Sequence, residues 1–303
     1  NTKLKDINAP MMKKWQNGLA ENYSNAYIRN IYGLFQKSLD LAVKLGLLNK
    51  NVAKQVGNVK KQKKKIDFWT QKEFEKVIST FDISDYYEHY TFIIIWLLFM
   101  TGLRLGEAQA LEWTDINFED KTLTVSKSMY YKSANEFYVT EPKTRAGNRT
   151  IALDDVTISY LAEWKSVQGR NVVSKYVLSY NGLPTNKSTT KHIIERHSKL
   201  AGVHTIKTHA LRHSHASLLI SLGENAIVVR DRLGHEDVET TLGTYGHLYP
   251  NTNKEVAKKL NNLISIQKDD TIKRNFISNQ FVKNRQSGCN NISLDCEEKE
   301  WDS

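Results

Sequence analysis

The segment Lys60-Lys-Gln-Lys-Lys-Lys65 constrains the organisation of this chain more than any other. Five of its six residues are lysines, and it has no apolar face. Because charged lysines are almost never fully buried, the segment cannot run through a hydrophobic core. We interpret it as the centre of an extended linker, residues 59–68, between two domains. A chain of 303 residues is long enough for two domains.

The excess of basic residues indicates what kind of molecule the protein binds. The formal net charge is +10 and the isoelectric point is about 9.3, which favours a polyanionic partner. Cys289 and Cys296 are the only cysteines and both lie near the end of the chain. They make neither a disulfide framework nor a zinc site, so we expect a reducing, cytoplasmic environment.

The longest apolar run, Phe92–Met100, is too short to span a bilayer, which takes about 20 residues. It predicts a buried helix instead, and no signal peptide is visible. The chain starts at Asn1 rather than at a methionine, in what reads as the middle of a domain. We therefore expect the first domain to be incomplete at its start, and whether another domain precedes it stays open.

The part before the linker, residues 1–58, is predicted to be helical. Apolar residues recur there at helical spacing, and Gly46 is a typical helix stop. The residues that form this pattern are Tyr27, Ile31, Leu34, Phe35, Leu39, Leu41, Ala42 and Leu45.

The second domain, residues 69–265, is predicted to be mainly helical with one small antiparallel sheet. Thr70 and Glu73 have the spacing of a capping box, and helices are expected from there to about residue 113. Alternating, β-rich segments predict strands at 122–125, 136–140 and 149–153, with residues 142–147 as the last turn. Helical periodicity returns at 156–168, 187–201, 209–222, 226–233 and 253–264. Residues 266–303 form a polar tail.

Four short motifs carry chemistry. They are Thr101-Gly-Leu-Arg-Leu-Gly-Glu107, His209-Ala-Leu-Arg-His213, Leu233-Gly-His235 and Tyr245-Gly-His247. An arginine fork binds two phosphate oxygens at once, and a tyrosine hydroxyl can become covalently bonded to phosphorus. Gly102 would let the backbone turn close to a phosphate. The spacing of His209 and Arg212 places both on one face of a helix.

In this order the motifs resemble the tyrosine recombinases, specifically the integrases of phages and conjugative elements. The resemblance covers residues 70 to about 250, and more weakly the part before them. It implies that Arg104 and Arg212 clamp a phosphate, with Glu107 orienting Arg104. It also implies that His209 and His235 hydrogen-bond to the same phosphate. Tyr245 would be the nucleophile, and Lys143 would protonate the leaving 5′ oxygen.

Some alternatives remain at single positions. Tyr249 is a second candidate nucleophile, and Arg145 is a second candidate for the role of Lys143. His213 and His215 are expected to be packing or capping residues. A free tyrosine has a pKa of about 10, and we expect the arginines and a phosphate-bound histidine nearby to make its anion more accessible.

The resemblance implies site-specific recombination: integration or excision of a mobile element through 3′-phosphotyrosyl intermediates and a Holliday junction. It implies a homotetramer on double-stranded DNA attachment sites in the bacterial nucleoid, accessory excision or DNA-bending proteins as further partners, and no cofactor or metal. The helical first domain would bind the core site, and Lys60, Lys61, Lys63, Lys64 and Lys65 would contact the DNA backbone. The helix at 253–264 has an apolar stripe that we expect to dock on a neighbouring subunit; the alternative is that it packs on its own domain.

Three other functions are compatible with parts of the pattern. A type IB topoisomerase uses related chemistry only to relax supercoils. A DNA-binding regulator would have the charge without the chemistry. A metallohydrolase would use histidines as ligands, and the candidates are His204, His209, His213, His215 and His235.

Overall fold

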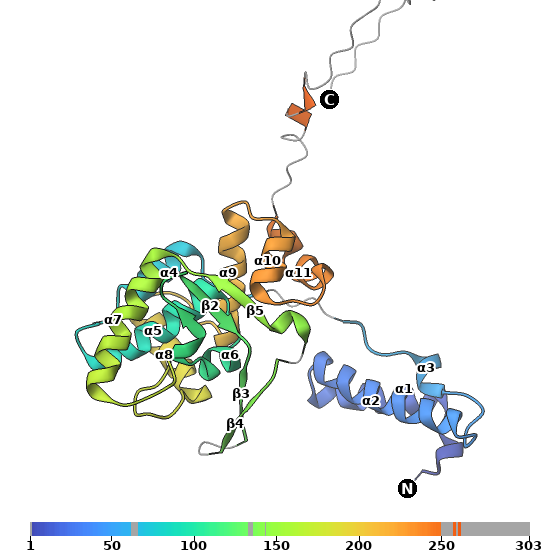
Figure 1. Ribbon diagram of the computed structural model, residues 1–303. Helices are drawn as coiled ribbons and strands as arrows, with labels where there is room; N and C mark the ends of the chain where they lie inside the picture. Colours follow the sequence, from blue (N-terminus) through green and yellow to red (C-terminus); the bar gives the residue numbers. More distant parts are fainter. Residues whose placement is uncertain are drawn as a thin grey trace, which may run out of the picture. The chain divides into compact units, whose positions relative to one another are not determined.

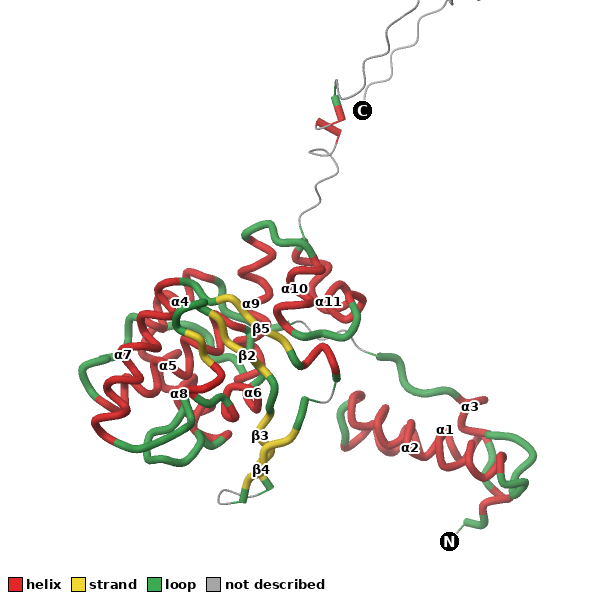
Figure 2. The backbone as a smooth tube through the Cα atoms, in the orientation of Figure 1, coloured by secondary structure: helices red, strands yellow, loops and turns green. Residues whose placement is uncertain are grey.

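The structure is a computed structural model, and it describes residues 2–61, 66–132, 136–142, 144–249, 257–258 and 260–261. Figure 1 shows the order of the elements, and Figure 2 shows that helices predominate over a few short strands. The predicted fold class, mainly α with a small antiparallel β component, is confirmed.

The segment before the lysine run is helical, as predicted. Side chains of Asn8, Ser24 and Asn51 cap its three helices, and the buried residues Met12, Tyr32, Leu39 and Ala53 form a small core between them. Gly46, with φ of +73°, follows the second helix in the left-handed conformation that ends helices. The elements are η1 (Leu4–Asp6), α1 (Ala9–Asn22), α2 (Asn25–Lys44) and α3 (Val52–Val56).

The segment from residue 66 onward is organised around one buried helix, α5 (Tyr86–Thr101). Twelve of its 16 residues are buried, which is typical of a helix that is apolar on all sides. It packs against α7 (Asp155–Asn171), α8 (Lys187–Ala201) and α9 (Thr208–Ser221). Among the described residues, no helix combines the length and the apolarity needed to cross a membrane.

The remaining helices surround this core and lead into the motifs. The predicted capping box of Thr70 and Glu73 is present and starts the first of them. The helices are α4 (Gln71–Ile78), α6 (Leu105–Ala110), α10 (Ala226–Leu233) and α11 (Val238–Tyr245), with the 3-10 turns η2 (Trp113–Asp115), η3 (Arg145–Gly147) and η4 (Gly246–Leu248).

The strands form two antiparallel sheets, so the expectation of a single sheet was wrong. One sheet has the order β1-β2-β5, with Leu123 of β2 opposite Ile151 of β5. The other is the β3-β4 ribbon, in which Tyr130 lies opposite Tyr138. The strands are β1 (Ile116–Asn117), β2 (Thr122–Val125), β3 (Ser128–Tyr131), β4 (Phe137–Thr140) and β5 (Arg149–Ala152).

The other predicted helices differ from the observed ones by three residues or fewer at each end, and α8 and α10 have the predicted bounds. The sequence pattern missed α11, which carries Tyr245 at its last position. The helix expected at 253–264 lies outside the described residues, apart from 257–258 and 260–261.

Candidate active site

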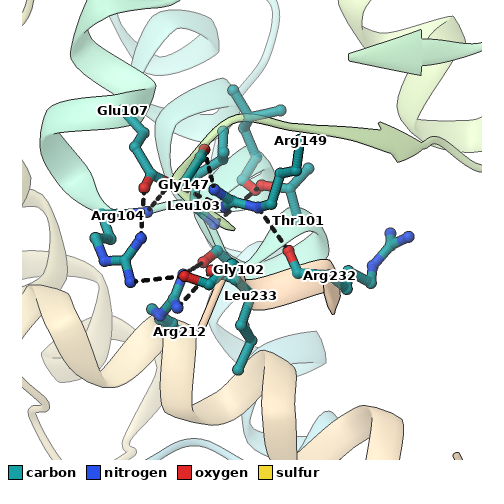
Figure 3. A network of polar contacts seen from close by, with 12 residues as sticks. Thr101, Gly102, Leu103, Arg104, Glu107, Gly147, Arg149, Arg212, Arg232 and Leu233 are labelled. Carbon is teal, nitrogen blue, oxygen red and sulfur yellow. Dashed lines mark hydrogen bonds and ion pairs between the residues drawn. The ribbon is translucent and has the colours of Figure 1, made fainter. Parts of the chain in front are cut away.

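Arg212 is held inside the protein by main-chain oxygens. It lies on α9, is 2% exposed, and donates from Nη1 to the carbonyl of Gly102 (2.8 Å) and from Nη2 to the carbonyl of Leu233 (2.6 Å) (Figure 3). Burial, and then the positive charge of Arg104, lower the pKa of Arg212 to about 9. The guanidinium therefore stays charged at neutral pH in a partly dehydrated position. An anion brought to it would interact more strongly than in water.

Arg104 lies beside Arg212 and is more accessible. Its Nη1 pairs with Glu107 Oε1 at 2.7 Å, its Nη2 donates to the carbonyl of Gly234 at 3.2 Å, and its side chain is 42% exposed. The predicted Arg104–Glu107 pair is therefore present. Arg104 and Arg212 hydrogen-bond to the consecutive carbonyls of Gly234 and Leu233, which brings the two cations together.

Glu107 also contacts an arginine that the motifs did not identify. Its Oε2 lies 2.9 Å from Nη2 of Arg149, the first residue of β5. Arg149 donates further hydrogen bonds to the carbonyls of Gly147 and Arg232 (Figure 3). Burial opposes ionisation of Glu107, but the hydrogen bond and charge of Arg149, together with the hydrogen bonds of Arg104, prevail and lower its pKa. Glu107 thus stays charged and fixes two guanidinium groups at once.

Two of the three carbonyls that anchor Arg104 and Arg212 belong to glycines. Gly102 ends α5 and Gly234 ends α10, both with positive φ (+65° and +67°). A Cβ atom on Gly102 would lie 2.6 Å from Cδ2 of His215 and 2.7 Å from Cδ2 of Leu233. The close approach that the structure shows at Gly102 is therefore to protein atoms, whereas the sequence suggested a close approach to phosphate.

His209 and His235 both lie within the electrostatic reach of the two arginines. Desolvation by the surrounding protein, and then the charges of Arg212 and Arg104, lower the pKa of His209. The same causes lower the pKa of His235 to about 4. Both imidazoles are therefore neutral at pH 7. A pocket of about 890 Å³ opens beside His209, lined in part by Leu103 and Leu105.

His235 has a partner that sets its orientation. Its Nδ1 lies 2.9 Å from Oγ1 of Thr241, a buried residue of α11. When the threonine hydroxyl donates to Nδ1, the ring carries its hydrogen on Nε2, as a phosphate-binding histidine requires.

Tyr245 is buried, at 1% exposure, and its hydroxyl lies 2.7 Å from Nδ1 of His213. Burial raises the pKa of Tyr245 to about 12, although the charge of Arg212 acts in the opposite direction. The charge of Arg212 acts in the expected direction, but desolvation outweighs it, so the Tyr245 anion is harder to form in the free protein than in water. His213, which was expected to be a packing or capping residue, forms a hydrogen bond with this hydroxyl.

This arrangement of two arginines, two neutral histidines and a buried tyrosine lies within a segment that matches known proteins. Residues 67–252 match the family model described as the phage integrase family. The chain belongs to this family.

One relative supports the assignment to the phage integrase family, and two solved structures share the fold. The ICEBs1 integrase of Bacillus subtilis (strain 168) is 35% identical over 249 residues, covering 80% of this chain and 67% of that protein. The Tn1549 transposon integrase, in a structure with transposon right end DNA, aligns with a TM-score of 0.72 at 20% identity and covers 88% of both chains. A lambda integrase dimer bound to a core site aligns with a TM-score of 0.58 at 18% identity, covering 78% of this chain and 82% of that one. The structures show that the fold is shared.

As a phage integrase family member, the chain is a tyrosine site-specific recombinase. The remaining candidate residues are the lysines and Arg145. Lys143, Lys63, Lys64 and Lys65 lie outside the described residues. Lys60 and Lys61 are exposed, as is Arg145 in η3.

The histidines considered as metal ligands have other partners. His204 contacts Asp67 and Glu73, at 3.0 and 3.2 Å, and Nε2 of the buried His215 accepts a hydrogen bond from Nε of Arg232. Within the described part of the chain, no three His, Cys, Asp or Glu side chains are grouped to hold a metal ion. His215, which was expected to pack or cap, is thus a buried residue that also holds Arg232.

Proposed function

We propose that Tyr245 is the nucleophile of a DNA strand transfer and that Arg104 and Arg212 bind the phosphate it attacks. The observation that supports this assignment is the anchoring of both guanidinium groups to consecutive carbonyls, directly before His235. Their remaining N–H groups form a fork suited to a phosphodiester. Arg212 is adjacent in sequence to His213, which contacts the Tyr245 hydroxyl.

In this reaction the Tyr245 oxygen forms a bond to phosphorus while the bond from phosphorus to the 5′ oxygen breaks. The arginines, with His209 and His235, stabilise the charge that develops on the non-bridging oxygens. Lys143 gives a proton to the departing 5′ oxygen. The 3′-phosphotyrosyl bond conserves the energy of the phosphodiester, so the 5′-hydroxyl of a partner strand can attack it without a supply of ATP.

The biological function is site-specific recombination of a mobile element. Both solved relatives named above are bound to DNA, and the net charge of +10 suits the same substrate here. We propose that residues 1–58 bind the core of the attachment site and that residues 59–68 link them to the catalytic domain at 69–265. Strand exchange then occurs in a homotetramer through a Holliday junction. Accessory excision or DNA-bending proteins are proposed partners.

The experiment that tests this function is a covalent trap. The protein is incubated with a library of nicked duplexes, denatured in detergent, and the DNA that remains attached is sequenced to define the site. Tyr245→Phe is expected to bind the recovered site normally and to form no adduct, because only the hydroxyl is lost. Tyr249→Phe is the matched control and should form the adduct at the wild-type rate.

Two results would overturn the proposal. An adduct formed by Tyr245→Phe would move the nucleophile elsewhere. Relaxation of supercoiled DNA without any sequence preference in the trapped DNA would favour the topoisomerase alternative over recombination.

A further inference from the structure

We propose that His213 is the group that takes the proton from Tyr245 when the tyrosine attacks DNA. This inference rests on the proposed function, because it assumes that Tyr245 is the nucleophile. It adds a catalytic residue to the site and assigns it a role separate from those of His209 and His235.

The geometry makes His213 the partner of the reacting atom. Its Nδ1 lies 2.7 Å from the Tyr245 oxygen, a normal hydrogen-bond length for a hydroxyl. The phenol is neutral in the free protein, with a pKa raised by burial to about 12, and burial lowers the pKa of His213 to about 4. Because the phenol and the imidazole are both neutral, the direction of this hydrogen bond depends on the imidazole tautomer. In the tautomer with its hydrogen on Nε2, the phenol O–H donates to Nδ1, which is then placed to receive the proton.

The other two histidines of the site are engaged differently. His235 uses its Nδ1 on Thr241. His209 lies one helical turn before His213 on α9, and its ring meets the His213 ring edge to face, with centroids 5.0 Å apart. Neither has a hydrogen bond to the Tyr245 hydroxyl among the described contacts, so His213 alone is placed to accept its proton.

The charges around His213 explain how the transfer depends on DNA. The groups that face it are His209 and Arg212 on α9 and Tyr245 on α11, and both His209 and Arg212 lower its pKa when charged. The difference in pKa between Tyr245 and His213 keeps the proton on the tyrosine in the free protein. A phosphate bound to Arg104 and Arg212 brings a negative charge that offsets the charge of Arg212, which favours protonation of His213.

The step balances without another reactant. The O–H bond of Tyr245 breaks and an N–H bond forms on His213, while the tyrosine oxygen bonds to phosphorus and the 5′ oxygen leaves with a proton from Lys143. When a 5′-hydroxyl attacks the phosphotyrosine, the proton of that hydroxyl passes to Lys143, and His213 returns its proton to the tyrosine oxygen.

The first test measures single-turnover cleavage of the trapped site by His213→Asn and His213→Ala. The substrate carries sulfur in place of the bridging 5′ oxygen, because a thiolate leaves without a proton and the rate then reports on the tyrosine. Asparagine keeps a hydrogen-bond acceptor near Nδ1 but is not basic. Both variants are expected to cleave about a hundredfold more slowly than wild type, with unchanged DNA binding. His192→Asn, at a histidine 72% exposed on α8, is the matched control and should not differ from wild type.

A second test separates proton transfer from placement of the ring. Fluorinated tyrosine at position 245 has a lower phenol pKa and needs a base less. It is expected to restore most of the rate lost in His213→Asn, and to leave the rate lost in His209→Asn unrestored.

Three outcomes would overturn the inference: wild-type or faster cleavage by His213→Ala, near-normal cleavage by His213→Asn, or no rescue by fluorotyrosine. Failure of the proposed function would be distinct, since Tyr245→Phe would then form adducts with His213 intact.

Discussion

Glu107 Oε2 and Arg149 Nη2 lie 2.9 Å apart inside the protein, and neither side chain is more than 7% exposed. The same carboxylate binds Arg104 through its other oxygen. Loss of the Glu107 charge would leave the buried Arg149 without a counter-ion. Breaking a buried ion pair from one side is strongly destabilising.

We therefore expect Glu107→Gln to lower the free energy of unfolding by about 3 kcal/mol, measured in urea at pH 7. Glu136→Gln, which breaks the exposed pair with Lys132, should lower it by less than about 1 kcal/mol. Because folding lowers the pKa of Glu107, its contribution is present above the pKa of an unfolded glutamate, about 4.3. It is lost as the pH falls below that value. The difference between wild type and Glu107→Gln should shrink there, and a constant difference would contradict this linkage.

Replacing Arg212 is expected to destabilise the protein more than replacing Arg104, although both substitutions should slow cleavage. Arg212→Ala leaves the carbonyls of Gly102 and Leu233 without their donor in a buried site, and should lower the free energy of unfolding by about 2 kcal/mol or more. Arg104→Ala removes a side chain that is 42% exposed, and should lower it by less. Each should slow cleavage by about a hundredfold or more. Equal losses of stability would show that the anchoring carbonyls do not need Arg212.

Gly102→Ala should destabilise the protein and slow cleavage together. The added methyl would lie 2.6 Å from a His215 atom, on a backbone with φ of +65° that side chains disfavour. Any shift that relieves this overlap moves the carbonyl that holds Arg212. Gly169→Ala in α7, where no atom lies within 4 Å, is the control and should stabilise by about 0.5–1 kcal/mol. Thermal unfolding and single-turnover cleavage of both variants check this pair.

The lysine run is expected to act through DNA phosphates, which position a protein without reading sequence. Replacing all five lysines with alanine should weaken binding to any duplex about equally. It should also reduce the slope of log affinity against log salt by about 0.9 for every phosphate that a lysine no longer neutralises. Replacing the same five with arginine keeps the charge and should leave the slope unchanged. A slope unaffected by alanine would mean that the run is only a solvated connection. The residues replaced are Lys60, Lys61, Lys63, Lys64 and Lys65.

Local patterns predicted the helices well because helix formation depends on neighbours in sequence. The α11 helix was not predicted because Thr240, Thr241 and Gly243 are weak helix formers. Strand pairing is a long-range property. Alternation predicted a strand at 136–140 but did not identify its partner, the preceding segment Ser128–Tyr131.

The same distinction applies to the site. The Arg104–Glu107 pair could be predicted because the residues are three positions apart on one helical turn. The ion pair of Glu107 with Arg149 joins residues 42 positions apart, and no spacing rule relates them. The hydrogen bond between Tyr245 and His213 depends on how α9 and α11 pack, so the motif could indicate the tyrosine but not its partner.

The carbonyls of Gly102, Leu233 and Gly234 anchor Arg104 and Arg212 with atoms that every amino acid possesses. Natural drift or laboratory selection can therefore exchange many side chains around the site while the two cations keep their positions. The glycines are the exception, because their backbone angles set where those oxygens point. Variant libraries built to redirect such an enzyme to new target sequences can vary most positions around the site if Gly102 and Gly234 are kept unchanged.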